Sequence, residues 1–404
     1  TRDGQIHVQN SPLVILAEDF NNTGSITNSN EQRRPDSLDV QSSISAETSY
    51  LDITPPGNSL ITLDGVFSNA GKIYSAELDV TARSGKVTNS GTLKLPKIKI
   101  EASGAIENSD TIETSMLNIT STDGGLSNSG TIKSLGTANI TIAKDFANAG
   151  GLLFTDKDLT LNTGGELLND SESRIVSQGR MSLKATGQID NRGHIQAKER
   201  LSVITDSSLD NSGNIQSDSN IVLTSIERMN NAVSGIIKSL GSQKITSKSG
   251  KIKNSGTIIS AKDATIDAYQ DFTNTGDIVA VTAPLQITSR TQGLVNSGKV
   301  IAPKITITGK NNIRNSDIIE TSILDITSTD GGLSNSGTIK SLGTANITIA
   351  KDFANVGGLL FTNRNLTLTA GGELLNDSEA RIVSKSGMSL KATGKIDNKG
   401  HIEA

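Results

Sequence analysis

A short motif centred on Asn recurs along the whole chain and constrains the fold more than any other feature. It consists of an apolar residue, one spacer, Asn, one spacer and usually Gly, as in VTNSG at 87–91, LSNSG at 126–130 and IKNSG at 252–256. Its Asn residues lie at positions 69, 89, 108, 128, 148, 169, 191, 211, 231, 254, 274, 296, 315, 335, 355, 376 and 398, in steps of 19 to 23 residues. A period of this length is typical of solenoid proteins, in which each repeat forms one coil.

A longer repeat contains the short one. Residues 110–197 align with residues 317–404 at a constant offset of 207 positions, and 72 of the 88 aligned residues are identical. The phrase LSNSGTIKSLGTANITIAKDFAN, for example, occupies 126–148 and returns unchanged at 333–355. The offset equals ten short repeats. Because a catalytic site is normally built once in a chain, two near-identical blocks of this length indicate structural material.

Each short repeat has the alternation of apolar and polar residues that is typical of β-strands. In residues 128–148, Ile140 and Ile142 alternate with polar or small residues. Asn and Gly tolerate positive φ angles, so the segment from Asn128 to Gly130 is predicted to turn the chain. No stretch has a sustained apolar period of 3.6 residues. The chain is therefore predicted to be all-β.

Stacking of equivalent strands is the expected way to bury the apolar residues of these repeats. Every repeat has the same order of strands and turns, so each strand is expected to pair in parallel with its equivalent in the next repeat. A parallel β-helix with coils of about 20 residues provides this arrangement, and each coil contacts only its neighbours. Residues 1–404 are expected to form a single β-helical rod, as an internal fragment of a longer protein, because the pattern runs to both ends.

Residues 25–66 fit the repeat least well. Asn22 and Asn69 are 47 positions apart, which is more than two repeats, and the intervening segment contains the pair Arg33 and Arg34. One coil without the motif and an irregular loop would account for this length. A specific binding loop is expected here rather than in the duplicated blocks, since recognition residues often lie on loops. Arg33 and Arg34 are candidate binding residues in this region.

The recurrent Asn is predicted to have a structural role. At one turn per coil, its side-chain amide would lie above the amide of the preceding coil, and stacked amides can form hydrogen bonds along the stack. This ladder is predicted for Asn69, Asn89, Asn108, Asn128, Asn148, Asn169, Asn191, Asn211, Asn254, Asn274, Asn296, Asn315, Asn335, Asn355, Asn376 and Asn398.

Hydroxyl side chains on the predicted outer face form a second candidate site. Thr141, Thr160, Ser182 and Ser202 occupy similar places in successive repeats and are expected to stack as a flat strip. Such a strip could bind a glycan or ice. Thr is also a favoured polar residue in any exposed strand, and this plainer interpretation is preferred.

The composition excludes several other functions. The 38 basic and 42 acidic residues are interspersed along the chain and give a net charge of −4, and there is no basic tract that would indicate binding of nucleic acid. The chain has no cysteine, which excludes disulfides and thiolate chemistry. It has no apolar run long enough to span a membrane. No spacing of His or carboxylate residues indicates a metal site, a cofactor or a catalytic residue, and the chain is not expected to be an enzyme.

The repeated motif, followed by Ile and an LxI or LxL segment, resembles the filamentous haemagglutinin repeats. The stretch GGELLNDSESRIVSQGRMSLKATGQIDNRGHIQA at 164–197 is especially similar to them. Such repeats occur in bacterial two-partner-secretion exoproteins, which include haemagglutinins and contact-dependent growth-inhibition effectors. The resemblance implies a right-handed parallel β-helix, export through an outer-membrane transporter, and a location on the bacterial surface or in the medium. No secretion domain or toxin domain of this class is recognisable in the 404 residues.

The resulting hypothesis is a structural stalk and interaction segment of a large secreted or surface-displayed adhesin or effector. Such a segment would project a distal binding or toxin domain and contact a protein or glycan receptor at a cell surface. The alternative is a glycan-binding or glycan-cleaving β-helix protein, because polysaccharide-degrading β-helices also carry carboxylates on adjoining coils. The candidates for such carboxylates are the pairs Asp123 and Asp145, and Glu166 and Asp170. Both pairs lie within the duplicated blocks, which disfavours a catalytic role.

Overall fold

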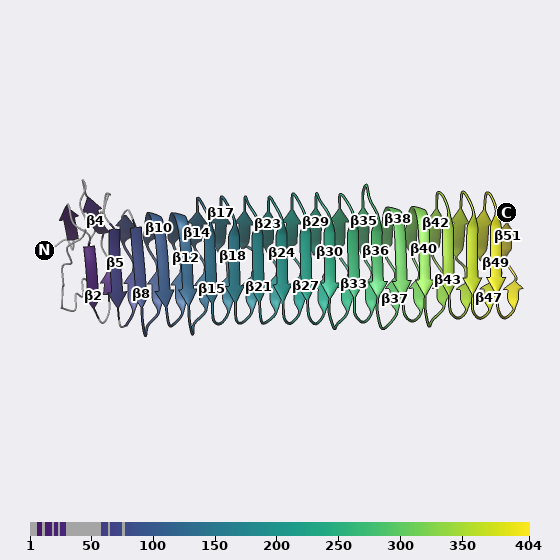
Figure 1. The fold of residues 1–404 in the computed structure, drawn as a ribbon, viewed down its shortest axis with the longest axis horizontal. Coiled ribbons are helices and arrows are strands. Elements are labelled where there is room, and N and C mark those ends of the chain that lie inside the picture. Colours follow the sequence, from purple (N-terminus) through teal and green to yellow (C-terminus); the bar gives the residue numbers. More distant parts are fainter. Residues whose placement is uncertain are drawn as a thin grey trace. The chain divides into compact units, whose positions relative to one another are not determined.

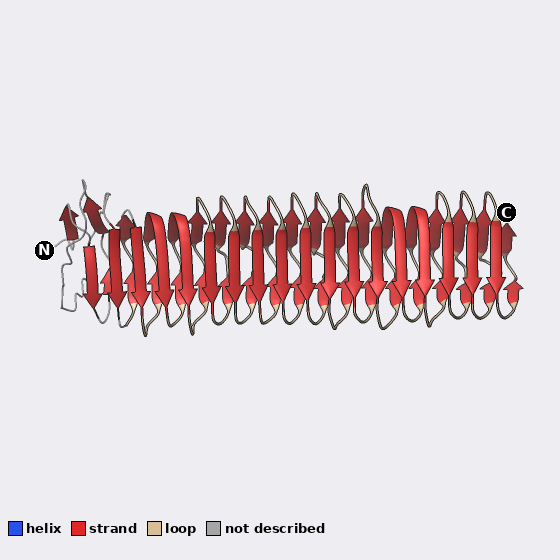
Figure 2. Ribbon diagram, in the orientation of Figure 1, coloured by secondary structure: helices blue, strands red, loops and turns tan. Residues whose placement is uncertain are grey.

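The computed structural model describes residues 6–9, 13–17, 20–22, 25–29, 58–63, 65–74 and 77–404. These residues form strands and turns, with no helix among them (Figure 2), so none of them belongs to a helix that could cross a membrane. The chain divides into two units, Thr1–Ser202 (unit 1) and Val203–Ala404 (unit 2), with the division inside strand β24 (Leu201–Thr205).

One coil of unit 1 shows how the repeat is built. Strand β13 (Leu126–Asn128) ends in the motif Asn, β14 (Thr131–Ser134) follows a turn, and β15 (Ala138–Ile142) follows a second turn. Side chains alternate between buried and exposed or half-buried in all three strands, as the sequence pattern predicts. Corresponding strands of successive coils form three rows: row 1 contains three-residue strands ending in Asn, row 2 mostly four-residue strands, and row 3 mostly five-residue strands.

The strands of unit 1 have the following bounds. Row 1 contains β3 (Phe20–Asn22), β6 (Phe67–Asn69), β9 (Val87–Asn89), β11 (Ile106–Asn108), β13, β16 (Phe146–Asn148), β19 (Leu167–Asn169) and β22 (Ile189–Asn191). Rows 2 and 3 contain β1 (Ile6–Gln9), β2 (Leu13–Ala17), β4 (Ser25–Ser29), β5 (Asn58–Leu63), β7 (Lys72–Tyr74), β8 (Glu77–Ala82), β10 (Thr92–Ala102), β12 (Thr111–Ser121), β14, β15, β17 (Leu152–Thr155), β18 (Leu159–Thr163), β20 (Arg174–Ser177), β21 (Met181–Ala185) and β23 (His194–Ala197).

Unit 2 continues the same scheme. Its row 1 contains β25 (Leu209–Asn211), β28 (Met229–Asn231), β31 (Ile252–Asn254), β34 (Phe272–Asn274), β37 (Leu294–Asn296), β39 (Ile313–Asn315), β41 (Leu333–Asn335), β44 (Phe353–Asn355), β47 (Leu374–Asn376) and β50 (Ile396–Asn398). Rows 2 and 3 contain β26 (Asn214–Ser217), β27 (Ile221–Ser225), β29 (Ile236–Ser239), β30 (Gln243–Ser247), β32 (Thr257–Ser260), β33 (Ala264–Ala268), β35 (Asp277–Ala280), β36 (Leu285–Ser289), β38 (Lys299–Gly309), β40 (Ile318–Ser328), β42 (Thr338–Ser341), β43 (Ala345–Ile349), β45 (Leu359–Thr362), β46 (Leu366–Ala370), β48 (Arg381–Ser384), β49 (Met388–Ala392) and β51 (His401–Glu403).

Strands of one row pair in parallel with their equivalents in the adjacent coils. In unit 1, β15 pairs with β12 on one side and β18 on the other, and in unit 2, β33 lies between β30 and β36 (Figure 1). Strands β10, β12, β38 and β40 each extend over 11 residues and serve rows 2 and 3 at once. The predicted all-β fold of stacked parallel coils is therefore confirmed as a parallel β-solenoid.

The apolar residues of the alternating pattern form the interior of each unit. Phe67 and Phe146 in unit 1, and Phe272 and Phe353 in unit 2, are fully buried at the first position of row 1. Each is covered by apolar residues of adjacent coils, as Leu126 and Leu167 flank Phe146 in the register. Burying an apolar side chain of this kind contributes about 1.5–3 kcal/mol, so stacking provides the core that an isolated coil lacks.

The region 25–66 has regular strands at both ends. Strand β4 pairs with β1 and β7, and β5 pairs with β2 and β8. Both strands therefore belong to the solenoid. Arg33 and Arg34, the predicted binding residues of this region, lie outside the described residues.

Candidate functional site

The motif Asn residues form a continuous chain of hydrogen-bonded side-chain amides within each unit, and all of those named below except Asn398 are buried. In unit 1, the Nδ2 atom of each Asn donates to the Oδ1 atom of the next at 2.7–3.0 Å, through Asn69, Asn89, Asn108, Asn128, Asn148, Asn169 and Asn191. In unit 2, the distances are 2.7–2.9 Å, through Asn211, Asn231, Asn254, Asn274, Asn296, Asn315, Asn335, Asn355, Asn376 and Asn398. The parallel register, which pairs each Asn with the next, aligns these amides.

Most of these amides also stabilise their own turn. Asn108 Nδ2 donates to the Asp110 carbonyl at 3.0 Å, and Asn254 Nδ2 donates to the Gly256 carbonyl at 3.1 Å. In these two amides the N–H groups are thus used both along the stack and within the turn. Because Asn128 and Asn254 are fully buried, these side chains can hold coils together but cannot reach a ligand in solvent.

Asn231 belongs to this chain although it was not among the predicted ladder residues. It lies in the sequence MNNAVSG, which has Val233 two positions after Asn231, where the motif usually has Gly. Its Nδ2 donates to the Gly235 carbonyl at 3.1 Å instead of to a carbonyl two residues ahead. The spacing of 20 residues from Asn211 is the sequence signal that identifies it.

In most coils, the Gly that stands two residues after the motif Asn is required for a different reason from the predicted one. Among the described residues, Gly150 and Gly357 are the glycines with positive φ, at 76° and 64°, so the prediction that Gly130 turns the chain through a positive φ is wrong. A Cβ atom on Gly130 would instead lie 2.1 Å from the carbonyl oxygen of Asp110 in the adjacent coil. At Gly130, Gly is needed because the stacked turns approach each other closely, whereas Gly150 and Gly357, which follow Asn148 and Asn355 in the same motif, have a positive φ and open space beside them.

Replacing Gly276 by Ala is expected to destabilise unit 2, because the added Cβ would lie 2.1 Å from the Gly256 carbonyl oxygen. Overpacking of this kind typically costs about 1–3 kcal/mol. The adjacent substitution Asp277→Ala, at an exposed position, is the matched control. A urea denaturation midpoint that is as high for Gly276→Ala as for Asp277→Ala would contradict the close-approach explanation.

The predicted strip of hydroxyl side chains does not form as one column. Thr160 aligns with Asn139 on one side and Ser182 on the other, whereas Thr141 aligns with Asn162 in the neighbouring column. The two residues occupy different places in their strands, because Thr141 is the fourth residue of β15 and Thr160 is the second residue of β18 (Leu159–Thr163), and the two strands pair from their first residues. Ser202, the remaining predicted residue of the strip, is half-buried in β24.

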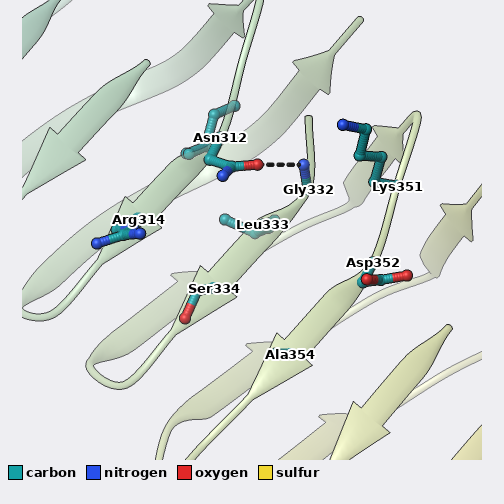
Figure 3. A pocket seen from close by; sticks show the side chains of 9 residues that line it. Asn312, Arg314, Gly332, Leu333, Ser334, Lys351, Asp352 and Ala354 are labelled. Carbon is teal, nitrogen blue, oxygen red and sulfur yellow. Dashed lines mark hydrogen bonds between the residues drawn. The ribbon is translucent and has the colours of Figure 1, made fainter. Parts of the chain in front are cut away.

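An open depression lies on the outer face of row 1 in unit 2 and has a volume of about 410 Å³. Strands β39, β41 and β44 and the turns that precede them line it (Figure 3). Arg314 pairs with Ser334, and Ser334 pairs with Ala354, so these three residues form one column on the outer face of the three strands. The depression forms because Ser334 and Ala354 are small and Gly332 has no side chain.

The polar groups of the depression are partly committed to the backbone. The Oδ1 atom of Asn312 accepts a hydrogen bond from the Gly332 N–H at 2.9 Å (Figure 3), and the Oδ1 atom of Asp352 accepts one from the Glu373 N–H at 2.8 Å. The side chains of Arg314 and Lys351 come from the coils on either side of Leu333. The Arg314 guanidinium and the Lys351 ammonium supply two positive charges, and Asp352 supplies one negative charge.

Comparison with known families identifies the repeat. The family described as haemagglutinin repeat matches residues 56–193, 176–276 and 342–400, which together make up more than half of the chain. The chain belongs to the haemagglutinin-repeat family. The resemblance inferred from the sequence is confirmed. Searches of curated proteins and of solved structures found no match.

Haemagglutinin-repeat proteins are typically structural adhesins that are secreted or exposed at the cell surface, and the family is associated with two-partner secretion. The repeat of this chain provides the stacked Asn amides and the closely packed Gly turns. The depression at Arg314 was not predicted from the sequence. It depends on which cations and carboxylates meet across adjacent coils, and the repeat pattern alone does not specify those contacts.

The carboxylates that were compared with polysaccharide-degrading enzymes have ordinary surface roles. Asp123 is 3.4 Å from the Lys144 ammonium, and Asp145 accepts a hydrogen bond from the Glu166 N–H at 2.8 Å. Asp170 accepts one from the Ser171 N–H at 2.7 Å. No group of three or more His, Asp or Glu side chains within the described part of the chain could hold a metal ion.

Proposed function

We propose that this haemagglutinin-repeat chain is a structural stalk and interaction segment of a large bacterial adhesin or contact-dependent inhibition effector. In this role it projects a distal binding or toxin domain and contacts a protein or glycan on another cell. The observation that carries the proposal is the repetition of one coil, held by the same buried amide chain, in both units. A repeated coil supplies length, whereas catalysis needs one unique arrangement of groups.

The chemistry of the coil supports a load-bearing role. Within a unit, an Asn amide is bonded to the amides of the coils before and after it, as Asn128 is bonded to Asn108 and Asn148 at 2.8 Å. Separating two coils would break this side-chain bond together with the backbone bonds of three strand rows. Interior hydrogen bonds of this kind leave buried polar groups unpaired when they are broken, at a cost of about 1–3 kcal/mol each.

The proposal includes an export route and a cellular location for the protein. The protein is exported through an outer-membrane two-partner-secretion transporter and is then displayed on the bacterial surface or released. Threading through a transporter suits a chain without cysteine, because no disulfide can lock it before it has crossed the membrane. Stepwise stacking of coils on the far side would then fold it, since each coil contacts only its neighbours.

An antibody raised against the 404-residue chain tests the location. It is expected to label intact producing cells or to detect the protein in the medium, and both signals are expected to be lost when the partner transporter is deleted. A cytoplasmic marker protein provides the control for lysis. Retention of the protein inside wild-type cells, with no surface label, would contradict the proposal.

A further inference from the structure

The segment that forms most of the depression is present in both units, but the coil before it carries different charges in unit 1 and unit 2. Gly332, Ser334, Lys351, Asp352 and Ala354 all belong to a segment that is repeated 207 positions earlier. The other two polar residues of the depression, Asn312 and Arg314, correspond to Ala105 and Glu107 in unit 1. The polar side chains at these positions therefore carry a net charge of +1 in unit 2 (Arg314 and Lys351 against Asp352) and −1 in unit 1 (Lys144 against Glu107 and Asp145).

The two units also differ in whether the cations at this surface form ion pairs with carboxylates of adjacent coils. In unit 1, Glu107 lies 3.4 Å from the Lys86 ammonium, and Lys144 lies 3.4 Å from the Asp123 carboxylate. Two of the three charged side chains of that surface, including its one cation, are thus neutralised by the protein itself.

In unit 2, the two cations of the depression are available to a ligand. Asp330, the equivalent of Asp123, lies 3.9 Å from Lys310, which stands where unit 1 has Ser103. Within the described part of the chain, neither Lys351 nor Arg314 has a carboxylate at ion-pair distance. The position equivalent to Lys86 is Gly293. Unit 2 therefore presents two unpaired cations at one depression, and an anionic ligand could supply their counter-charge.

The remaining groups indicate the chemistry of that ligand. A guanidinium group binds a planar carboxylate through two parallel hydrogen bonds. The Nδ2 atom of Asn312, the Ser334 hydroxyl and the second oxygen of Asp352 can bond hydroxyl groups beside the carboxylate. Asp352 would repel a doubly charged group such as phosphate more than a singly charged one. We propose that the depression at Arg314 and Lys351 binds a sugar residue that carries a carboxylate, within an acidic polysaccharide.

The size and openness of the depression suit one residue of a longer chain. Its volume of about 410 Å³ falls within the range of roughly 300–1,000 Å³ that is usual for small-ligand sites. Because it is open to solvent along row 1, a polysaccharide can extend beyond it in both directions. The site assigns a class of ligand to the interaction segment of the proposed function. Its biological role rests on that proposed function. The binding itself can be tested without the surface-location experiment.

Calorimetric titration of the full 404-residue chain with trigalacturonic acid tests the inference, with galactotriose as the neutral probe. The wild-type chain is expected to bind trigalacturonic acid and not galactotriose. Arg314→Glu, which installs the unit 1 residue type, is expected to weaken binding at least about tenfold, because it removes a charge-assisted contact and adds repulsion. Lys351→Met, which keeps the apolar stem, is expected to weaken it less.

Arg364→Glu makes the same charge change at an exposed position outside the depression and is the matched control. It is expected to bind as the wild type does. Circular dichroism of each variant checks that the solenoid is retained. Equal affinity of Arg314→Glu and Arg364→Glu, equal binding of the neutral probe, or no binding of trigalacturonic acid by the wild-type chain would each overturn the inference. Surface labelling could still succeed in any of these cases, so the two proposals fail separately.

Discussion

Replacing Asn128 by Ala is expected to lower the denaturation midpoint of unit 1 clearly, whereas replacing the adjacent Ser129 by Ala is expected to leave it nearly unchanged. Asn128 accepts from Asn108 and donates to Asn148, both at 2.8 Å, and its side chain is fully buried. In the Ala variant, the Oδ1 atom of Asn148 loses its donor. The Nδ2 atom of Asn108 keeps its bonds to the Asp110 and Thr131 carbonyls.

The expected loss is about 1–3 kcal/mol, the usual cost of leaving a buried hydrogen-bonding group unpaired. Urea denaturation followed by circular dichroism measures it, and midpoints should be compared because a long repeat array need not unfold in a single step. Asn128→Asp keeps the size of the side chain but, when ionised, cannot donate to Asn148. It is expected to be no more stable than the Ala variant at neutral pH. Equal midpoints for Asn128→Ala and Ser129→Ala would show that the amide chain contributes little.

The fold could be predicted from the sequence because one physical constraint is repeated in every coil. Residues such as Ile140 and Ile142 alternate with polar ones, and a period of two places them on one side of a strand. The constant spacing of the motif then requires strands of the same kind to stack. Both features are local or periodic in the sequence, so neither depends on knowing the structure.

Contacts between coils were harder to predict, because each row 3 strand has two outward positions and the columns that they form have to be told apart. Thr160 is the second residue of β18 and lies beside Asn139, the second residue of β15, whereas Thr141 is the fourth residue of β15 and lies beside Asn162. A regular column of hydroxyl groups is found elsewhere. Row 3 of unit 2 carries Thr on five successive coils, at Thr288, Thr308, Thr327, Thr348 and Thr369.

The role of the motif Gly also required the structure. Gly is compatible with a positive φ and with a close approach of backbones, and the sequence cannot distinguish these two reasons. The distance of 2.1 Å between a hypothetical Gly130 Cβ and the Asp110 carbonyl oxygen decides for close approach. Similarly, the charge of Lys351 is visible in the sequence, but its lack of an ion-pair partner depends on Asp330 lying beside Lys310.

Deleting one complete coil from unit 2 is expected to leave a folded protein, whereas deleting half a coil is expected to disrupt the fold. Removal of residues 252–271 joins Lys251 to Phe272, which is the register partner of Ile252. The shortened chain can then pair β34 with β28, so that Asn274 takes the place of Asn254 next to Asn231 in the amide chain. Rows 2 and 3 remain equivalent in the same way, because Ile258 aligns with Ile278 and Ala264 with Leu285.

Removal of residues 252–261 instead deletes the strand that supplies Asn254 and the whole of the next strand, β32. Row 1 would then receive polar residues of the turn before β33, and the amide chain of unit 2 would be interrupted at Asn231. Solubility, circular dichroism and resistance to trypsin measure the outcome. The whole-coil variant is expected to match the parent chain in all three, because each coil is stabilised by its neighbours and not by a unique partner. If both deletions were equally insoluble and protease-sensitive, the coils would not be interchangeable, and length alone could not explain why the sequence contains the same block twice.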